Sequence, residues 1–221
     1  MFDLIIFDCD GVLIDSEVLS AEVLISELAG HGVDVDHAYV RRHFLGRSFP
    51  TVAKTIREDF HTALSPDFEA SYRRRLLKRF ETDLHVTHGV EKVLDGLKVP
   101  FCVATSSSPP RVTRSLEITG LLPRFAGRIF TASEVERGKP APDLFLHVAA
   151  KMNSAPTRTL VIEDSAPGIE AARAAGMAVL CYTGGQHLKG QAFDSAAQVR
   201  AFDDWSDFPR VVAELEKAQS T

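Results

Sequence analysis

Short apolar runs alternate with helical patterns along most of this 221-residue sequence, and this alternation constrains the fold more than any other feature. Parallel strands need long crossover connections, which are usually helices, so the pattern predicts a parallel sheet covered by helices. We predict strands at residues 4–7, 100–105, 128–131, 159–162 and 178–182, with a sixth candidate at 199–202. Helical patterns lie between them at residues 111–120 and 142–152, and Gly168 and Gly176 enclose an alanine-rich helix.

Residues 16 to 86 interrupt the alternation, because they contain four helical patterns and no strand. Apolar side chains recur there at four-residue spacing, as in Val52, Ile56 and Phe60. Ser48 and Ser65 are expected to be N-caps, since each precedes a proline by one or two positions. A block of this length is too long for an ordinary crossover. We therefore predict an all-helical cap domain at residues 16–86, inserted into a core formed by residues 1–15 and 87–221.

Composition and charge limit the cellular location and the partners that we expect for the protein. No apolar run approaches the roughly 20 residues of a membrane helix, and the first eight residues resemble a strand more than a secretory signal. The cysteine count is odd, which argues against a fully paired oxidised protein. We expect a cytoplasmic location without membrane contact. A net charge of −5 gives no general attraction to nucleic acid. Oligomeric state is not readable, and a monomer is compatible with the sequence.

The first predicted strand ends in two carboxylates, in the stretch Phe7-Asp8-Cys9-Asp10-Gly11. Two acids separated by one residue, where the chain leaves a strand, can point into the same crevice. Such a pair suits a hard cation with oxygen ligands. It also suits a division of roles, in which one carboxylate attacks and the other exchanges protons. The alternative is a solvated acidic strand end.

Two further strand–loop junctions carry groups that suit a phosphate. Thr105 and Ser106 open a serine-rich turn before a helix, where a hydroxyl and backbone N–H groups can hold an anion. Lys139 lies in Gly138-Lys139-Pro140-Ala141-Pro142, where prolines limit the positions that the lysine can reach. A lysine held in this way can neutralise a transferring phosphoryl group. The alternatives are a helix cap and an exposed lysine.

The fourth junction ends in two adjacent acids, Glu163 and Asp164, just before the alanine-rich helix. Asp164 could complete the coordination of a cation, directly or through water, with Glu163 as an outer ligand. The alternative is that both acids cap the following helix. Ligands of parallel α/β sheets bind at the carboxyl ends of strands, so the four junctions together predict one site.

With these motifs in this order, the sequence resembles the haloacid dehalogenase-like hydrolases. Within them it is most similar to the beta-phosphoglucomutases and sugar-phosphate phosphatases that carry a helical cap after the first motif. The resemblance covers the whole chain and is most specific at residues 7–17, 138–143 and 163–176. It implies a Rossmann-like core with the inserted cap, and a magnesium-dependent phosphomonoester hydrolase acting on a small phosphorylated metabolite.

The resemblance also implies roles for single residues. Asp8 is expected to be the nucleophile that becomes an aspartyl-phosphate, and Asp10 the general acid and base. Thr105 and the Ser106 backbone would bind phosphate beside Lys139. The ligands of Mg²⁺ would be Asp8, the carbonyl of Asp10, Asp164 and, directly or through water, Glu163. Substrate contacts are expected from Gly46, Arg47 and Ser48 in the cap and from Glu17 where the cap begins. As the acid of the first step, Asp10 should have a raised pKa in the enzyme–substrate complex.

Two other functions stay open at this point. A phosphosugar mutase of the same group would carry a histidine in the first cap helix, and this sequence has Ser20 at the corresponding position, which favours hydrolysis. A non-enzymatic, receiver-like phospho-switch could use similar acids, a hydroxyl and a lysine. Such a switch is shorter and has no need for a cap of 70 residues.

Overall fold

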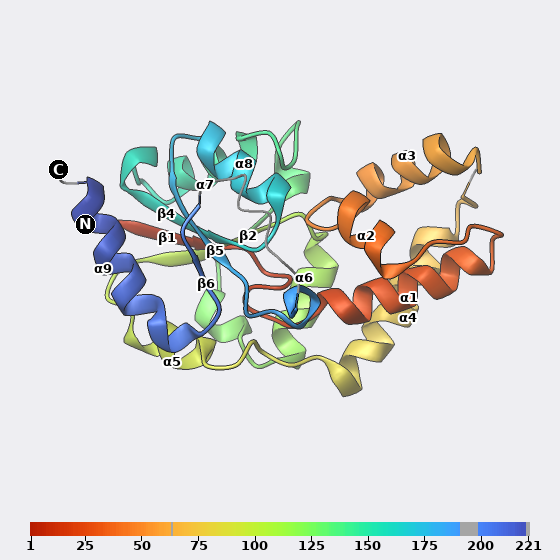
Figure 1. Ribbon diagram of the computed structural model, residues 1–221, viewed down its shortest axis with the longest axis horizontal. Helices are drawn as coiled ribbons and strands as arrows, with labels where there is room; N and C mark the ends of the chain where they lie inside the picture. Colours follow the sequence, from red (N-terminus) through yellow and green to blue (C-terminus); the bar gives the residue numbers. More distant parts are fainter. Residues whose placement is uncertain (63, 191–198, 220–221) are drawn as a thin grey trace.

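The computed structural model describes residues 1–62, 64–190 and 199–219. At its centre is a six-stranded sheet whose neighbouring strands are all parallel (Figure 1). The strands are β1 (Leu4–Phe7), β2 (Phe101–Thr105), β3 (Ile129–Thr131), β4 (Thr159–Glu163), β5 (Ala178–Tyr182) and β6 (Ala201–Phe202), in the spatial order β3-β2-β1-β4-β5-β6. The predicted α/β fold is confirmed, and each predicted strand lies within two residues of an observed one.

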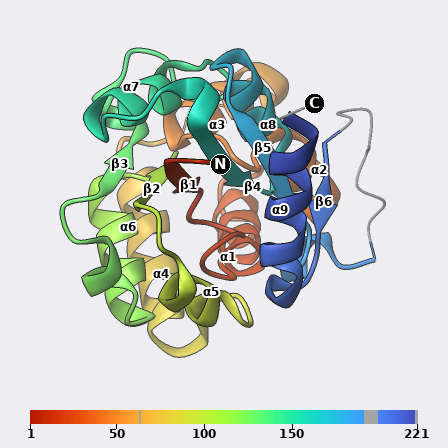
Figure 2. The same cartoon turned by 90° about the vertical axis from the view of Figure 1, so that its left-hand side faces the viewer.

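Helices cover both faces of this sheet. They are α5 (Val90–Gly96), α6 (Pro109–Ile118), α7 (Asp143–Lys151), α8 (Ala166–Ala174) and α9 (Phe208–Gln219). Ile6 of β1 is buried with side chains of α7 and α8, whereas Phe7 is buried with side chains of α5, α6 and α9. Figures 1 and 2 show the two layers on opposite sides of the sheet. Burial on both faces explains why the strands are continuous apolar runs without alternating polar residues.

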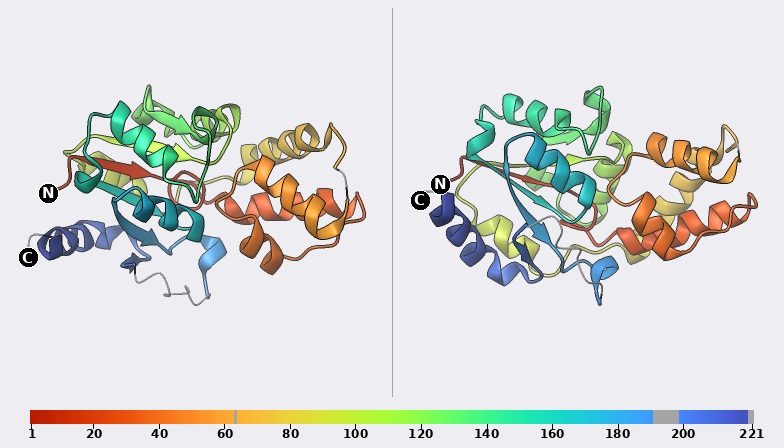
Figure 3. Two further views of the ribbon diagram at one scale, coloured as in Figure 1. Left: turned by 90° about the horizontal axis from the view of Figure 1, so that it is seen from above. Right: turned by 45° about the horizontal axis from the view of Figure 1, so that its top comes forward.

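The strandless block forms four helices beyond the carboxyl ends of the strands (Figures 1 and 3). They are α1 (Glu17–Ala29), α2 (His37–His43), α3 (Phe49–Phe60) and α4 (Phe68–Asp83). Their apolar stripes are buried, as the four-residue spacing predicts, and Val52 and Ile56 of α3 belong to the same hydrophobic cluster as Leu76 and Phe80 of α4. Among the described residues no helix is long and apolar enough to cross a membrane.

The two expected N-caps have different outcomes. Ser48 is the N-cap residue of α3, although its hydroxyl contacts the Thr51 hydroxyl and no backbone N–H group. The prediction for Ser65 is wrong, because α4 begins after Asp67. The Ser65 carbonyl instead accepts a hydrogen bond from the N–H of Phe68, which closes a turn before the helix.

Candidate active site

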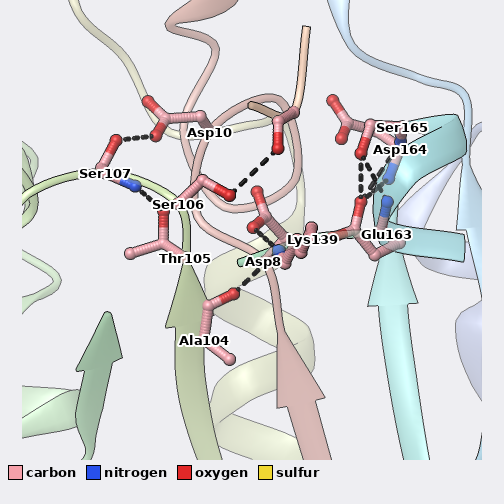
Figure 4. A network of polar contacts seen from close by, with 12 residues as sticks. Asp8, Asp10, Ala104, Thr105, Ser106, Ser107, Lys139, Glu163, Asp164 and Ser165 are labelled. Carbon is pink, nitrogen blue, oxygen red and sulfur yellow. Dashed lines mark hydrogen bonds and ion pairs between the residues drawn. The ribbon is translucent and has the colours of Figure 1, made fainter. Parts of the chain in front are cut away.

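A buried lysine joins the carboxyl ends of β1 and β4. The ammonium group of Lys139 donates to the carboxylate of Asp8, to Oε1 of Glu163 at 2.6 Å and to the carbonyl of Ala104 at 3.1 Å (Figure 4). Asp8 directly follows β1, and Glu163 is the last residue of β4. The Lys139 side chain is 1% exposed, so these three acceptors replace the water that a charged amine would otherwise bind.

Burial and neighbouring charges shift the pKa values of Asp8 and Lys139 in opposite directions. Desolvation raises the pKa of Asp8 well above its usual range, although the positive charge of Lys139 opposes that rise. Desolvation alone would lower the pKa of Lys139, but the charges of Asp8 and Glu163 outweigh it and raise the pKa overall. Lys139 is therefore a fixed positive charge against Asp8 at neutral pH.

Asp10 is held by three donors on the other side of the loop after β1. Ser16 Oγ donates to Oδ1 at 2.6 Å, Ser107 Oγ donates to Oδ2 at 2.6 Å, and the guanidinium of Arg111 lies 2.8 Å from Oδ1. Burial alone would raise the pKa of Asp10, but Arg111 and the two hydroxyls hold it below its usual value. These contacts favour the ionised form of Asp10 in the free protein. The expected rise of its pKa concerns the substrate complex and stays a prediction.

The turn after β2 connects the sheet to the helical block. Thr105 is buried, and its hydroxyl oxygen accepts the N–H of Ser107 at 3.0 Å, which leaves the hydroxyl proton available to a ligand. Ser106 Oγ donates to the carbonyl of Gly46 at 3.0 Å. Gly46 has a φ of +72°, and a Cβ there would lie 2.4 Å from Ser165 Oγ, so glycine allows this loop to approach the strand ends closely.

Asp164 provides a test of whether the site suits a cation. Its side chain is 3% exposed, and its Oδ2 has no hydrogen-bond partner among the described residues. Desolvation and the neighbouring Glu163 raise its pKa well above its usual range. A buried carboxylate oxygen without a partner is costly, and a hard divalent cation would satisfy it. The donor set therefore fits a magnesium ion.

The side chains alone do not complete a metal site. Across the described ranges, no three Asp, Glu, His or Cys side chains lie close enough to hold an ion by themselves. Further ligands would have to be backbone carbonyls, water or substrate oxygens, which is usual for Mg²⁺. Glu163 is fully buried and bonded to Lys139, to Ser165 Oγ and to backbone N–H groups, so the structure places it against the lysine.

A cavity of about 510 Å³ lies between the strand ends and the helical block. Asp8, Asp10, Thr105 and Ser106 line it from the sheet side. Residues of the helical block line it from the other side, and they include the predicted substrate contacts Glu17, Gly46, Arg47 and Ser48, together with Ser20, Tyr72 and Arg73. Burial, and after it the charge of Asp10, raises the pKa of Glu17 to about 8.

Sequence reasoning missed Arg111. This arginine lies in the first turn of α6, and it joins Asp10 to Ser20 of α1, whose hydroxyl lies 3.1 Å from its guanidinium. It also lies over the ring of Phe80 in α4. A signal was present, because a positive charge in the first turn of a helix opposes the helix dipole and needs a tertiary reason. Burial would lower the pKa of Arg111, but Asp10 and its neighbours raise it.

The carboxyl ends of the parallel strands thus gather an aspartate pair, a buried lysine and a second acidic pair. This places the protein among the α/β proteins that bind ligands at the carboxyl ends of parallel strands. Residues 2–176 match the family model described as haloacid dehalogenase-like hydrolase. The chain belongs to this family of enzymes, and the resemblance predicted from the motifs is confirmed. Family membership removes the receiver-like switch as an alternative.

Similar proteins agree with this assignment. The 6-phosphogluconate phosphatase of Escherichia coli (strain K12) is 26% identical over 186 residues, which cover 84% of either chain. A solved haloacid dehalogenase-like protein from Agrobacterium tumefaciens is 35% identical with a TM-score of 0.82, covering 98% of this chain and 100% of that one. A solved family hydrolase from Deinococcus radiodurans, with bound phosphate and sodium, is 31% identical with a TM-score of 0.73 and 96% coverage of both chains.

Proposed function

We propose that this protein is a magnesium-dependent phosphomonoester hydrolase that acts on a small phosphorylated metabolite through an aspartyl-phosphate on Asp8. One observation carries the proposal: the ammonium group of Lys139 is buried against the Asp8 carboxylate at the edge of the cavity. A carboxylate can attack a phosphate dianion only if their mutual repulsion is offset, and a fixed positive charge beside the nucleophile does this.

The remaining residues have separate tasks in the proposed reaction. Asp8 attacks phosphorus, while the hydroxyl of Thr105 and the backbone of Ser106 hold the phosphate oxygens. Asp10 protonates the departing alcohol oxygen and then takes a proton from the water that attacks the aspartyl-phosphate. Because Arg111 favours an ionised Asp10 in the free protein, the first of these steps requires Asp10 to acquire a proton and turn from Arg111 toward the substrate.

A magnesium ion would be held by Asp8, the backbone carbonyl of Asp10 and Asp164. When bound, it would offset the negative charge of the nucleophile and the phosphate. We place Glu163 behind this site, where it balances Lys139 and orders the loop through the N–H groups of Asp164 and Ser165. This second carboxylate keeps Lys139 in place if Asp8 moves during the reaction.

We propose further that residues 16–86 act as a cap over a core of residues 1–15 and 87–221. The block contributes more than half of the residues that line the cavity and reaches the strand ends through Gly46. Arg47 and Glu17 would contact the part of the substrate beyond the phosphate. The relatives named for 6-phosphogluconate and for phosphorylated carbohydrates support a sugar phosphate or phosphosugar acid.

Hydrolysis is favoured over a mutase reaction, because Ser20 lies where a mutase has a histidine. Serine cannot replace the imidazole in proton transfer, and its hydroxyl accepts a hydrogen bond from Arg111. A cytoplasmic location is supported by the three cysteines, which are buried as free thiols.

The test is phosphate release from a panel of phosphorylated sugars, sugar acids and nucleotides with Mg²⁺, using Asp8→Asn as the matched control. We expect multiple turnovers of at least one sugar phosphate by the wild type and none by the variant, which is nearly isosteric and should fold normally. Conversion of a phosphosugar to its isomer without free phosphate would contradict the proposal in favour of a mutase.

A further inference from the structure

His187 is buried beside Asp164 by a loop that follows β5. The loop carries a single 3-10 turn, η4 (Gln186–Leu188), and packs against α1. The N–H of Gln186 donates to Asp15 Oδ1 at 3.0 Å, which fastens the loop to the segment that leads from Asp10 into the cap. Although it lies on a glycine-rich loop, the side chain of His187 is only 8% exposed.

Three polar atoms without hydrogen-bond partners meet at this point. Within the part of the chain that the structure describes, these atoms are both ring nitrogens of His187 and Oδ2 of Asp164. Nε2 lies 3.0 Å from Oδ2, which is ion-pair distance for a protonated imidazole, yet the geometry does not form a hydrogen bond. Buried polar atoms are rarely left unpaired, because each one loses its water without replacement. Their meeting indicates a ligand that both side chains share.

Two glycines make room for this arrangement. A Cβ at Gly11 would lie 1.8 Å from Asp164 Oδ2 and 2.9 Å from Cε1 of His187. A Cβ at Gly185 would lie 2.8 Å from the same Cε1 atom. Any other residue at either position would push the imidazole away from Asp164. The backbone is thus shaped to let the ring reach the metal-binding carboxylate.

We propose that His187 supplies an imidazole nitrogen to the divalent cation that Asp164 binds. The inference rests on the proposed function, because it concerns the same cation. Two neighbouring ligands of an octahedral ion, each about 2.1 Å from it, lie about 3.0 Å apart. The distance between Nε2 and Oδ2 is 3.0 Å, which is the separation that such a pair of ligands requires.

A nitrogen ligand changes which cations the site prefers. Carboxylates, carbonyls and water suit Mg²⁺ and Mn²⁺, whereas imidazole raises the affinity for the later transition ions along the Irving–Williams order. We expect the site to bind Mn²⁺ and Co²⁺ more tightly than Mg²⁺, and His187→Gln to reduce this preference. Glutamine keeps a polar side chain of similar length on the loop but removes the imidazole.

The test uses Mn²⁺ as the probe and needs no substrate. Pulsed EPR of the Mn²⁺-loaded protein should show coupling to a nitrogen, which changes from the ¹⁴N to the ¹⁵N pattern when the protein is made with ¹⁵N-histidine. The coupling should disappear in His187→Gln and persist in His85→Gln, whose histidine is exposed elsewhere on the surface. Calorimetry should give a Kd for Mn²⁺ about 10- to 100-fold higher in His187→Gln.

Several results would overturn this inference. They are the absence of nitrogen coupling in wild-type protein loaded with Mn²⁺, coupling that survives in His187→Gln, and a Kd for Mn²⁺ that the substitution leaves unchanged. The ¹⁵N-histidine experiment on the wild type stands even if the variant does not fold. An active phosphatase without imidazole coupling would refute the inference alone, whereas imidazole coupling without any phosphate release would refute the proposed function alone.

Discussion

Replacing Lys139 by methionine should destabilise the protein strongly at neutral pH and much less in acid. Methionine fills similar space, and the amine already lies beside the ring of Phe145, so loss of packing is small. The charge is what changes. The substitution leaves Asp8 and Glu163 buried without their common partner, with side chains 10% and 0% exposed. Removing one partner of a buried ion pair costs about 3–5 kcal/mol, a large share of the roughly 5–15 kcal/mol that stabilises a domain.

The pH dependence follows from the proton that the Asp8 carboxyl binds. Burial already raises the pKa of Asp8 in the wild type, and the loss of the opposing charge of Lys139 raises it further. Between the unfolded pKa of an aspartate, about 4, and the raised folded pKa of Asp8, the folded variant binds more protons than its unfolded chain, so its stability increases as pH falls through that range. The difference from wild type should therefore be smaller at pH 5 than at pH 7.5, because protonation of Asp8 removes one of the two buried negative charges.

Urea unfolding followed by the fluorescence of buried Trp205, in EDTA at pH 5 and pH 7.5, measures this difference. Lys151→Met is the matched control, because Lys151 is exposed at the end of α7 and should change stability by less than about 0.5 kcal/mol. An equal loss at both pH values, or a loss below about 1 kcal/mol at pH 7.5, would refute the ion-pair account of Lys139.

Three more outcomes are expected. Arg111→Gln should move the limb of the kcat–pH profile that reports Asp10 to higher pH, because it removes the charge that holds the pKa of Asp10 low; an unchanged pH profile in steady-state assays would contradict this. Glu17→Gln should stabilise the metal-free protein at pH 8 by roughly 1–3 kcal/mol but not at pH 4. The reason is that the pKa of Glu17 is about 8 in the folded protein and about 4.5 in the unfolded chain, so the wild type loses stability as pH rises through this range. Urea unfolding at both pH values checks the sign. Thr105→Val should reduce kcat/KM about 10-fold through one lost hydrogen bond, and an unchanged value would remove the hydroxyl from the phosphate site.

The strands and the residues at their ends were readable from sequence, and the reason is geometric. Apolar runs of strand length define β1, β2 and β4, and parallel pairing brings their carboxyl ends to one edge. Asp8, Thr105 and Asp164 therefore had to lie near one another once the sheet was predicted. Lys139 does not directly follow a strand, because β3 ends at Thr131. It could be assigned to the site only from its sequence motif.

The partners of these residues were not readable in the same way. The packing of α6 against α1 and α4 decides which of its side chains reaches Asp10. Helical periodicity alone does not distinguish Arg111 from the other residues of the first turn. The role of Glu163 as an outer metal ligand stays a prediction; what the sequence did not show is its contact with Lys139, which depends on how the loop of Lys139 folds against the strand ends. The N-cap of α4 is Asp67 and not Ser65. The sequence did not distinguish the two, because aspartate and serine suit an N-cap equally well.

The central claim, that Asp8 carries the phosphoryl group during turnover, is tested most directly by rapid acid quenching of a single turnover followed by mass spectrometry of the N-terminal peptide. We expect one added phosphoryl group on Asp8 in the wild type and none in Asp8→Asn. Phosphate release at a normal rate by the variant, or a phosphoryl group on another residue of the wild type, would contradict the account.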